Sequence, residues 1–165
     1  MDILHQLQLW AKGDATQGKV MLIAGVILAI AVILMIMNGN TMQKGMLIPL
    51  GLLLILNFGY GGFLTLTRTD HAKKVEELHA ANAQEAVSQE LAKAEKDSKT
   101  YGLVKPVWGG LMVVGVAMFF FFSGDYWKGL SLGILVLCTA GLIIDTFLHH
   151  RLEPYLEALR TANGG

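Results

Sequence analysis

Hydrophobic residues along this chain gather into four long runs that are separated by polar stretches. Charged residues are absent from positions 20–43, 46–67, 107–124 and 129–144. Because roughly 20 residues of α-helix cross a bilayer core of about 30 Å, each run can span it together with its flanking residues. The pattern therefore predicts an all-α integral membrane bundle with four spanning helices, at about 19–37, 46–67, 102–122 and 127–148.

The composition agrees with a membrane location. Of the 165 residues, 53% are hydrophobic and 16% are charged, and the mean hydropathy is +0.50. Soluble domains carry about 25% charged residues, so this chain has too little polar surface to cover a globule in water. The formal net charge is zero, which gives no electrostatic reason to expect a nucleic-acid partner. The lipid bilayer is the expected main surrounding of the chain.

The basic residues are distributed unequally between the two sides of such a bundle. With four spans, all the Lys and Arg residues except Lys44 and Lys128 fall on one side or just inside it. Cytoplasmic loops are enriched in Lys and Arg, so this side is predicted to be the cytoplasm. Both termini and the central polar segment would then lie inside a plasma (inner) membrane.

The two halves of the chain share a weak spacing pattern. An offset of 84 residues places Gly18 on Gly102 and Gly45 on Gly129. A tandem repeat would give two helical hairpins related by a pseudo-two-fold axis along the membrane normal. Chance similarity is the alternative interpretation, because glycines are common in any membrane hairpin.

Two segments before the third span are predicted to be cytoplasmic amphipathic helices. Residues 1–12 carry an apolar stripe that Gly13 would end, and such a segment before a first span usually lies in the headgroup plane. Residues 68–100 are rich in Ala, Glu, Lys and Gln, which favours helix. Within them, Asn82 and Glu85 have capping-box spacing, which predicts a second helix at about 83–98.

The apolar stripes of the segment 68–100 are narrow, and its charges alternate in sign. We expect these stripes to pack on each other, on a second copy of the chain or on a partner. Residues 149–165 are predicted to continue the fourth span as a cytoplasmic helix and tail. Pro154 would either kink that helix or lie in the first turn of a new one.

Polar and small residues share one face of the second predicted span. Asn57, Gly61 and Thr65 follow each other at intervals of four, with Tyr60 as a neighbour. Small residues let helices approach closely, and a buried Asn can supply an interhelical hydrogen bond, so helix packing is the first interpretation. The alternative is a polar line that faces a water-filled path or a ligand.

Two opposite charges are predicted at similar depth near the inner edge of the third and fourth spans. Lys105 and Asp145 would offset each other's cost of burial, so we expect their side chains to approach each other. Such a pair either fixes the packing of the two helices or relays protons or ions.

A candidate group at the inner interface follows Asp145 along the chain. It consists of His149, His150 and Glu153. Adjacent histidines on a regular helix point in different directions, and zinc needs three or four converging ligands. We therefore expect no metal and no cofactor. The group is interpreted as a helix that emerges at the membrane boundary, with Asp145 held by Lys105 and His149.

Three functions are compatible with these features. The first is a non-enzymatic scaffold or accessory subunit that self-associates, or binds a membrane or cytoplasmic protein, through its cytoplasmic helices. The second is a homo-oligomeric channel or small transporter that uses the Asn57 stripe and the pair of Lys105 and Asp145. The third is an interfacial membrane enzyme that uses the inner-interface group, although the sequence shows no catalytic residues in a recognisable arrangement.

Overall fold

The computed structural model describes residues 3–164, and nearly all of them are helical. The elements are α1 (Ile3–Asn38), α2 (Thr41–Ile55), the π-helix η1 (Leu56–Tyr60), α3 (Gly61–Ala81), α4 (Ala83–Phe121) and α5 (Asp125–Asn163). No strand occurs among the described residues. Residues 1, 2 and 165, the ends of the predicted segments 1–12 and 149–165, lie outside this range.

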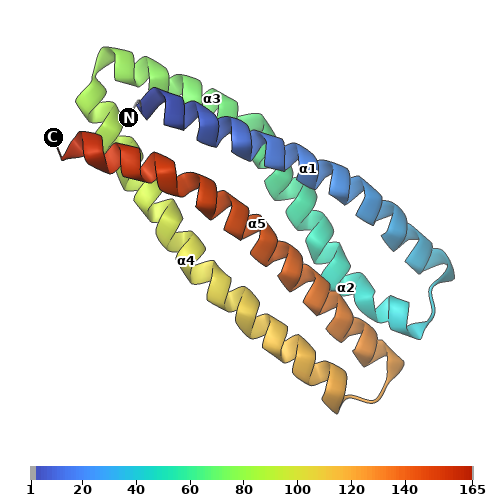
Figure 1. Ribbon diagram of the computed structural model, residues 1–165. Helices are drawn as coiled ribbons and strands as arrows, with labels where there is room; N and C mark the ends of the chain where they lie inside the picture. Colours follow the sequence, from blue (N-terminus) through green and yellow to red (C-terminus); the bar gives the residue numbers. More distant parts are fainter. Residues whose placement is uncertain (1–2, 165) are drawn as a thin grey trace.

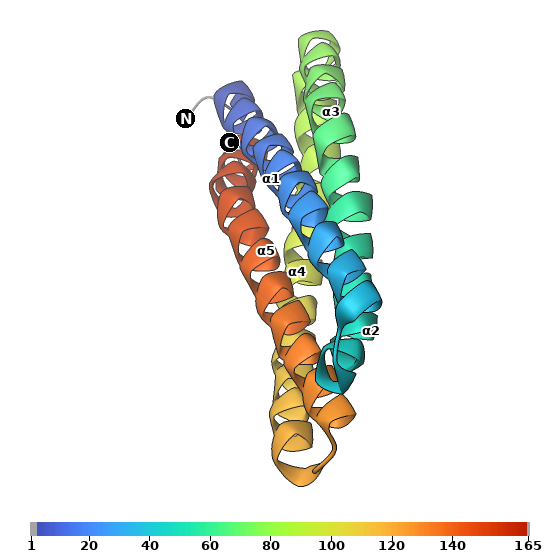
Figure 2. The same ribbon diagram turned by 90° about the vertical axis from the view of Figure 1, so that its right-hand side faces the viewer.

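Because α2, η1 and α3 continue one another, the molecule consists of four long helical rods (Figure 1). Each rod is long and apolar enough to cross a membrane. Both termini and the α3–α4 turn lie at one end, called here the terminal end, and two short turns lie at the other (Figures 1 and 2). The rod α5 packs against α4, α2 and α1, and α1 packs against α3. The prediction of an all-helical fold with four candidate spans is confirmed.

The molecule buries apolar side chains at one end and exposes many of them toward the other end. At the terminal end, a core encloses Leu7, Val75, Val87, Leu152 and Tyr155. Toward the other end, large apolar side chains point outward, including Ile27, Val113 and Phe121. The apolar stripes of 68–100 belong to the core, so they pack within the chain itself.

The helix α1 does not end at Gly13, contrary to the prediction. Its first turns bury Leu7 and Trp10 within the bundle, so the segment is not a separate helix lying beside it. Glycine costs about 1 kcal/mol relative to alanine inside a helix, a penalty that such packing can exceed. Gly13 also makes room for Arg151, because a Cβ there would lie 2.6 Å from the Arg151 Cδ atom.

The turn between α3 and α4 lies where the capping spacing predicts it. The Asn82 side chain accepts a hydrogen bond from the Glu85 backbone N–H over 3.2 Å. The expected end of this helix near residue 98 is wrong, because α4 continues to Phe121 without a break. Likewise, α5 runs through Pro154, so no new helix begins there. Pro154 and His150, whose carbonyl loses its usual helical donor, both lie on the exposed side of α5.

The two hairpins meet through equivalent residues near their turns. Gly45 on α2 packs directly against the Tyr126 carbonyl of α5, and Gly129 on α5 packs directly against the Met42 carbonyl of α2. Met42 and Tyr126 are separated by the same 84 residues as the two glycines. A two-fold axis parallel to the rods would produce such a reciprocal contact.

Candidate functional site

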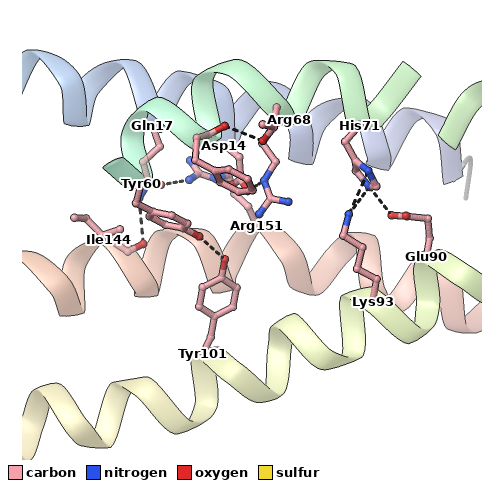
Figure 3. Close-up of polar contacts among 12 residues, drawn as sticks. Asp14, Gln17, Tyr60, Arg68, His71, Glu90, Lys93, Tyr101, Ile144 and Arg151 are labelled. Carbon is pink, nitrogen blue, oxygen red and sulfur yellow. Dashed lines mark hydrogen bonds and ion pairs between the residues drawn. The ribbon is translucent and has the colours of Figure 1, made fainter. Parts of the chain in front are cut away.

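A buried carboxylate joins three of the four rods at the terminal end. Asp14 on α1 is fully buried, with Oδ2 3.2 Å from the Arg68 Nε atom and Oδ1 3.2 Å from the Arg151 Nε atom (Figure 3). Arg151 also donates to the Gln17 side chain, which in turn donates to the Ile144 carbonyl over 3.1 Å. The carboxylate thus forms ion pairs with guanidinium groups of α3 and α5 at once, and it accepts a hydrogen bond from Arg151.

The electrostatic balance of this triad follows from its burial. Burial raises the pKa of Asp14 to about 6, against the opposing influence of Arg68 and Arg151. At pH 7 the carboxyl is mainly ionised and offsets one of the two guanidinium charges. The triad then retains one net positive charge at the terminal end.

Aromatic side chains hold the Arg68 guanidinium in place. Its Cζ atom lies 4.5 Å from the centre of the Trp10 ring, within range of a cation–π interaction. Trp10 in turn stacks on Tyr155, with ring centres 5.3 Å apart and planes inclined by 19°. The edge of this layer meets His71, whose ring is 6.1 Å from Trp10 and nearly perpendicular to it. The layer restricts the position of Arg68 from one side.

A second polar cluster links α3, α4 and α5. His71 Nε2 lies 3.1 Å from the Glu90 Oε2 atom, and Tyr155 donates to the same oxygen over 3.2 Å. Lys93 Nζ lies 2.8 Å from His71 Nε2 and 3.2 Å from Nδ1. Because a carboxylate only accepts and an ammonium only donates, we assign Nε2–H as the donor to Glu90 and Nδ1 as the acceptor from Lys93.

Partners and burial shift the pKa values within this second cluster. Burial acts to raise the pKa of Glu90, but the hydrogen bond from His71, together with Lys93 and Tyr155, leaves it lowered. Burial lowers the pKa of Lys93, although Glu90 acts in the opposite direction. Glu90 therefore remains ionised at neutral pH.

Tyr60, a predicted candidate, bridges to α4. Its hydroxyl oxygen lies 3.3 Å from that of Tyr101, and either hydroxyl can be the donor (Figure 3). Burial raises the pKa of Tyr101 well above its usual range, so its hydroxyl stays protonated. The two hydroxyls lie beside the ionic clusters of the terminal end.

The stripe of Asn57, Gly61 and Thr65 faces α1. A Cβ on Gly18 would lie 2.6 Å from the Gly61 carbonyl oxygen and 2.9 Å from the Thr65 backbone nitrogen. A Cβ on Gly25 would lie 3.2 Å from that of Asn57. The expected interhelical hydrogen bond is wrong, because the Asn57 amide donates to the Leu53 carbonyl of its own helix over 2.9 Å. The stripe is a close-packed surface between helices.

Lys105 and Asp145 form no ion pair, although Lys105 lies close enough to act on the charge of Asp145. Asp145 Oδ2 accepts from the Trp108 indole N–H over 2.7 Å, and Lys105 Nζ lies 2.9 Å from His149 Nδ1. In the antiparallel pair α4 and α5, residue 108 faces 145 and residue 105 faces 149, so the expected pair is displaced by one turn. Gly141 makes this possible, because a Cβ there would lie 2.6 Å from the Trp108 ring.

The inner-interface group does not converge on one point. His149 turns toward α4, with Nε2 3.2 Å from the Ser98 hydroxyl, whereas the His150 side chain is 82% exposed. Glu153 lies at the exposed surface, 4.0 Å from His149 and 3.8 Å from His150. Within residues 3–164, no group of three or more His, Cys, Asp or Glu is arranged to hold a metal ion.

The sequence pattern contained one signal for the buried triad. Asp14 falls in phase with Leu7, Trp10 and Gly18, which places a carboxylate on the buried face of α1. A charge on such a face requires a cationic partner. The identity of that partner could not be read from local spacing, because Arg151 lies 137 residues away.

Comparisons of the chain with family models, with curated proteins and with solved structures give no match. The role of the polar network is therefore argued from its own geometry.

Proposed function

We propose that the chain is a non-enzymatic protein of the plasma (inner) membrane that serves as a self-associating or partner-binding accessory subunit. It crosses the bilayer four times, and its termini and the α3–α4 turn lie in the cytoplasm. The reciprocal packing of Gly45 and Gly129 supports an origin of the two hairpins as a tandem repeat. The distribution of Lys and Arg supports the orientation.

The observation that carries this proposal is the fixed terminal end of the bundle. The ion pairs of Asp14 with Arg68 and Arg151 connect α1, α3 and α5, and the Tyr155–Glu90 hydrogen bond adds α4. Helices held in this way form a preformed surface, and preformed surfaces bind partners with a smaller entropic cost. Most of the titratable side chains of the network serve this fixation, which favours a binding role over an enzymatic one.

The proposed binding surface consists of the faces of α3 and α4 that are not part of the core. Val75 and Val87 are buried inside the chain, so a partner or a second copy must use the outer faces of α3 and α4. The exposed charged residues there include Lys73, Lys74, Glu77, Lys96 and Lys99. A surface of mixed charge suits a partner that carries complementary charges, with an association rate that falls as salt is added.

A charge-reversal experiment tests the binding role. The double substitution Lys73→Glu and Lys74→Glu changes the exposed face of α3 without touching the core. The matched control is Lys12→Glu with Lys19→Glu, on an exposed face of α1. We expect the detergent particle of the wild type to exceed the mass of one chain, and the α3 variant alone to lose the added mass. A wild-type particle containing a single chain and no other protein would refute the proposal.

A labelling experiment tests the orientation separately. In a Cys138→Ala background, single cysteines replace Lys44, Lys128 or Lys73. A membrane-impermeant maleimide is expected to label the first two in intact cells and the third only after lysis. The opposite labelling pattern would invert the topology.

A further inference from the structure

A wedge-shaped cavity lies between α3 and α4, which diverge from their turn at Asn82. Its volume is about 380 Å³, within the range of about 300–1,000 Å³ typical of small-molecule sites. All its walls come from η1, α3 and α4. The polar residues that carry the argument are Tyr60, Arg68, His71, Lys93, Asp97 and Tyr101.

Two cationic side chains in this wedge have donors to spare. The Arg68 guanidinium faces Asp14 through Nε, and its two Nη groups make no hydrogen bond to any described residue. The Lys93 ammonium has three donors, and the single accepting nitrogen of His71 uses one of them. Both cations line the same cavity, so an anionic group with several oxygens could accept from them together.

A carboxylate lines the same cavity. Asp97 follows Lys93 by one helical turn and is close enough to act on its charge. A purely anionic ligand would meet repulsion from Asp97, whereas a ligand with an additional positive group would not. The aromatic rings of Tyr60 and Phe63, which also line the wedge, suit an organic ammonium. The wedge is therefore complementary to a phosphate joined to an ammonium by a short link.

The wedge lies at the depth of lipid headgroups in the proposed topology. Tyr60 and Phe63 fall inside the predicted second span, and Tyr101 immediately precedes the third. Leu66, next to the lining residue Thr67, and Leu103, two residues after Tyr101, are each 74% exposed. They provide apolar surface for acyl chains on the same two helices. Basic pockets between spanning helices on the cytoplasmic side are known to bind lipid headgroups.

We infer that the wedge between α3 and α4 binds the headgroup of a phosphatidylethanolamine-type lipid, with its phosphate at Arg68 and Lys93 and its ammonium at Asp97. This inference goes beyond the accessory role and shares with it only the placement of the bundle in a bilayer. The same phosphate–ammonium chemistry occurs in soluble phosphoethanolamine, which lacks the acyl chains that the neighbouring leucines would contact.

Lipid retention measured by native mass spectrometry tests this inference. The purified full chain is released from detergent in the presence of equal amounts of phosphatidylethanolamine and phosphatidylglycerol with identical acyl chains. We expect the wild type to retain the ethanolamine lipid several-fold more. Lys93→Gln should lower the retention of both lipids about tenfold, because it removes a charged donor to phosphate. Asp97→Asn should abolish the preference between the two lipids.

Matched variants control for surface charge. Lys96→Gln and Asp70→Asn change the same charges at exposed positions of α4 and α3, and they should leave retention and preference unchanged. Lys93→Gln is preferred to a change at Arg68, which is part of the buried triad. Equal retention of the two lipids by the wild type, or full retention by Lys93→Gln, would overturn the inference. If soluble phosphoethanolamine competed for the cavity as strongly as the lipid does, the inference that the ligand is a lipid would be overturned.

Discussion

Trp108 on α4 donates its indole N–H to the Asp145 carboxylate on α5 over 2.7 Å. This hydrogen bond lies where the indole ring packs against Gly141. Removal of the donor by Trp108→Phe leaves a carboxylate without its partner, which should lower the free energy of unfolding by about 1–3 kcal/mol. Chemical denaturation of the protein in detergent micelles measures this loss.

The matched variant Asp145→Asn keeps an acceptor oxygen for the indole, so its expected loss of unfolding free energy is smaller. Lys105→Met should leave the Trp108–Asp145 bond intact, because Lys105 contacts His149 instead. If Trp108→Phe cost no more unfolding free energy than Asp145→Asn, the hydrogen-bond assignment would be refuted.

Two glycines that are 84 residues apart should respond to alanine in opposite ways. A Cβ on Gly18 would lie 2.6 Å from the Gly61 carbonyl oxygen, whereas a Cβ on Gly102 would meet no atom within 4 Å. Gly18→Ala should therefore destabilise the bundle by about 1–3 kcal/mol, because backbones must separate. Gly102→Ala should be neutral or stabilise by up to about 1 kcal/mol through helix propensity. Thermal unfolding of both variants in the same detergent compares them, and equal shifts would refute the assigned packing.

Features that depend on neighbouring residues could be predicted from the sequence. The four apolar runs follow from residue type alone, and the turn at Asn82 follows from its spacing to Glu85. The face shared by Asn57, Gly61 and Thr65 was also predicted from periodicity. The three residues share this face although the π-helix η1 begins within the span. That π-helix has no sequence signal of its own and was not predicted.

Features that depend on distant residues could not be predicted in this way. Gly13 indicates a helix end by local rules. However, the Arg151 side chain packs against Gly13 and Trp10 is buried, and both contacts favour a continuous helix. Matched depth suggested a contact of Lys105 with Asp145, but depth is known only to about one turn. The register of α4 on α5 decides the pairing, and it depends on the close approach of Trp108 to the opposite helix.

The Tyr155 side chain should contribute mainly through its ring. Tyr155→Phe keeps the stack on Trp10 and removes the hydrogen bond to Glu90, which retains His71 as a donor. The expected loss is about 1 kcal/mol. Tyr155→Ala removes the ring from a fully enclosed position, and should cost about 3–5 kcal/mol. Tryptophan fluorescence during denaturation measures both losses, and similar values for the two variants would contradict the role given to the stack.

The stability of the bundle should depend on pH through Asp14. Its pKa is raised from an ordinary value of 3.8 to about 6 in the folded protein, chiefly by burial. The folded state then binds the proton more tightly than the unfolded chain does. The resulting stabilisation is complete below about pH 3.8 and is lost as the pH rises through about 6, a total of roughly 3 kcal/mol. Unfolding midpoints between pH 4 and 7 measure it as the difference between the wild type and Asp14→Asn.

Glu90 provides a control of opposite sign. Its pKa is lowered from 4.5 by His71, Lys93 and Tyr155 despite burial, so its stabilisation is present above that value and is lost as the pH falls. The difference between the wild type and Glu90→Gln should therefore grow as the pH rises through 4.5, while the difference for Asp14→Asn declines. If the Asp14 difference also grew with pH, the two arginines would outweigh burial, and Asp14 would be ionised throughout this range.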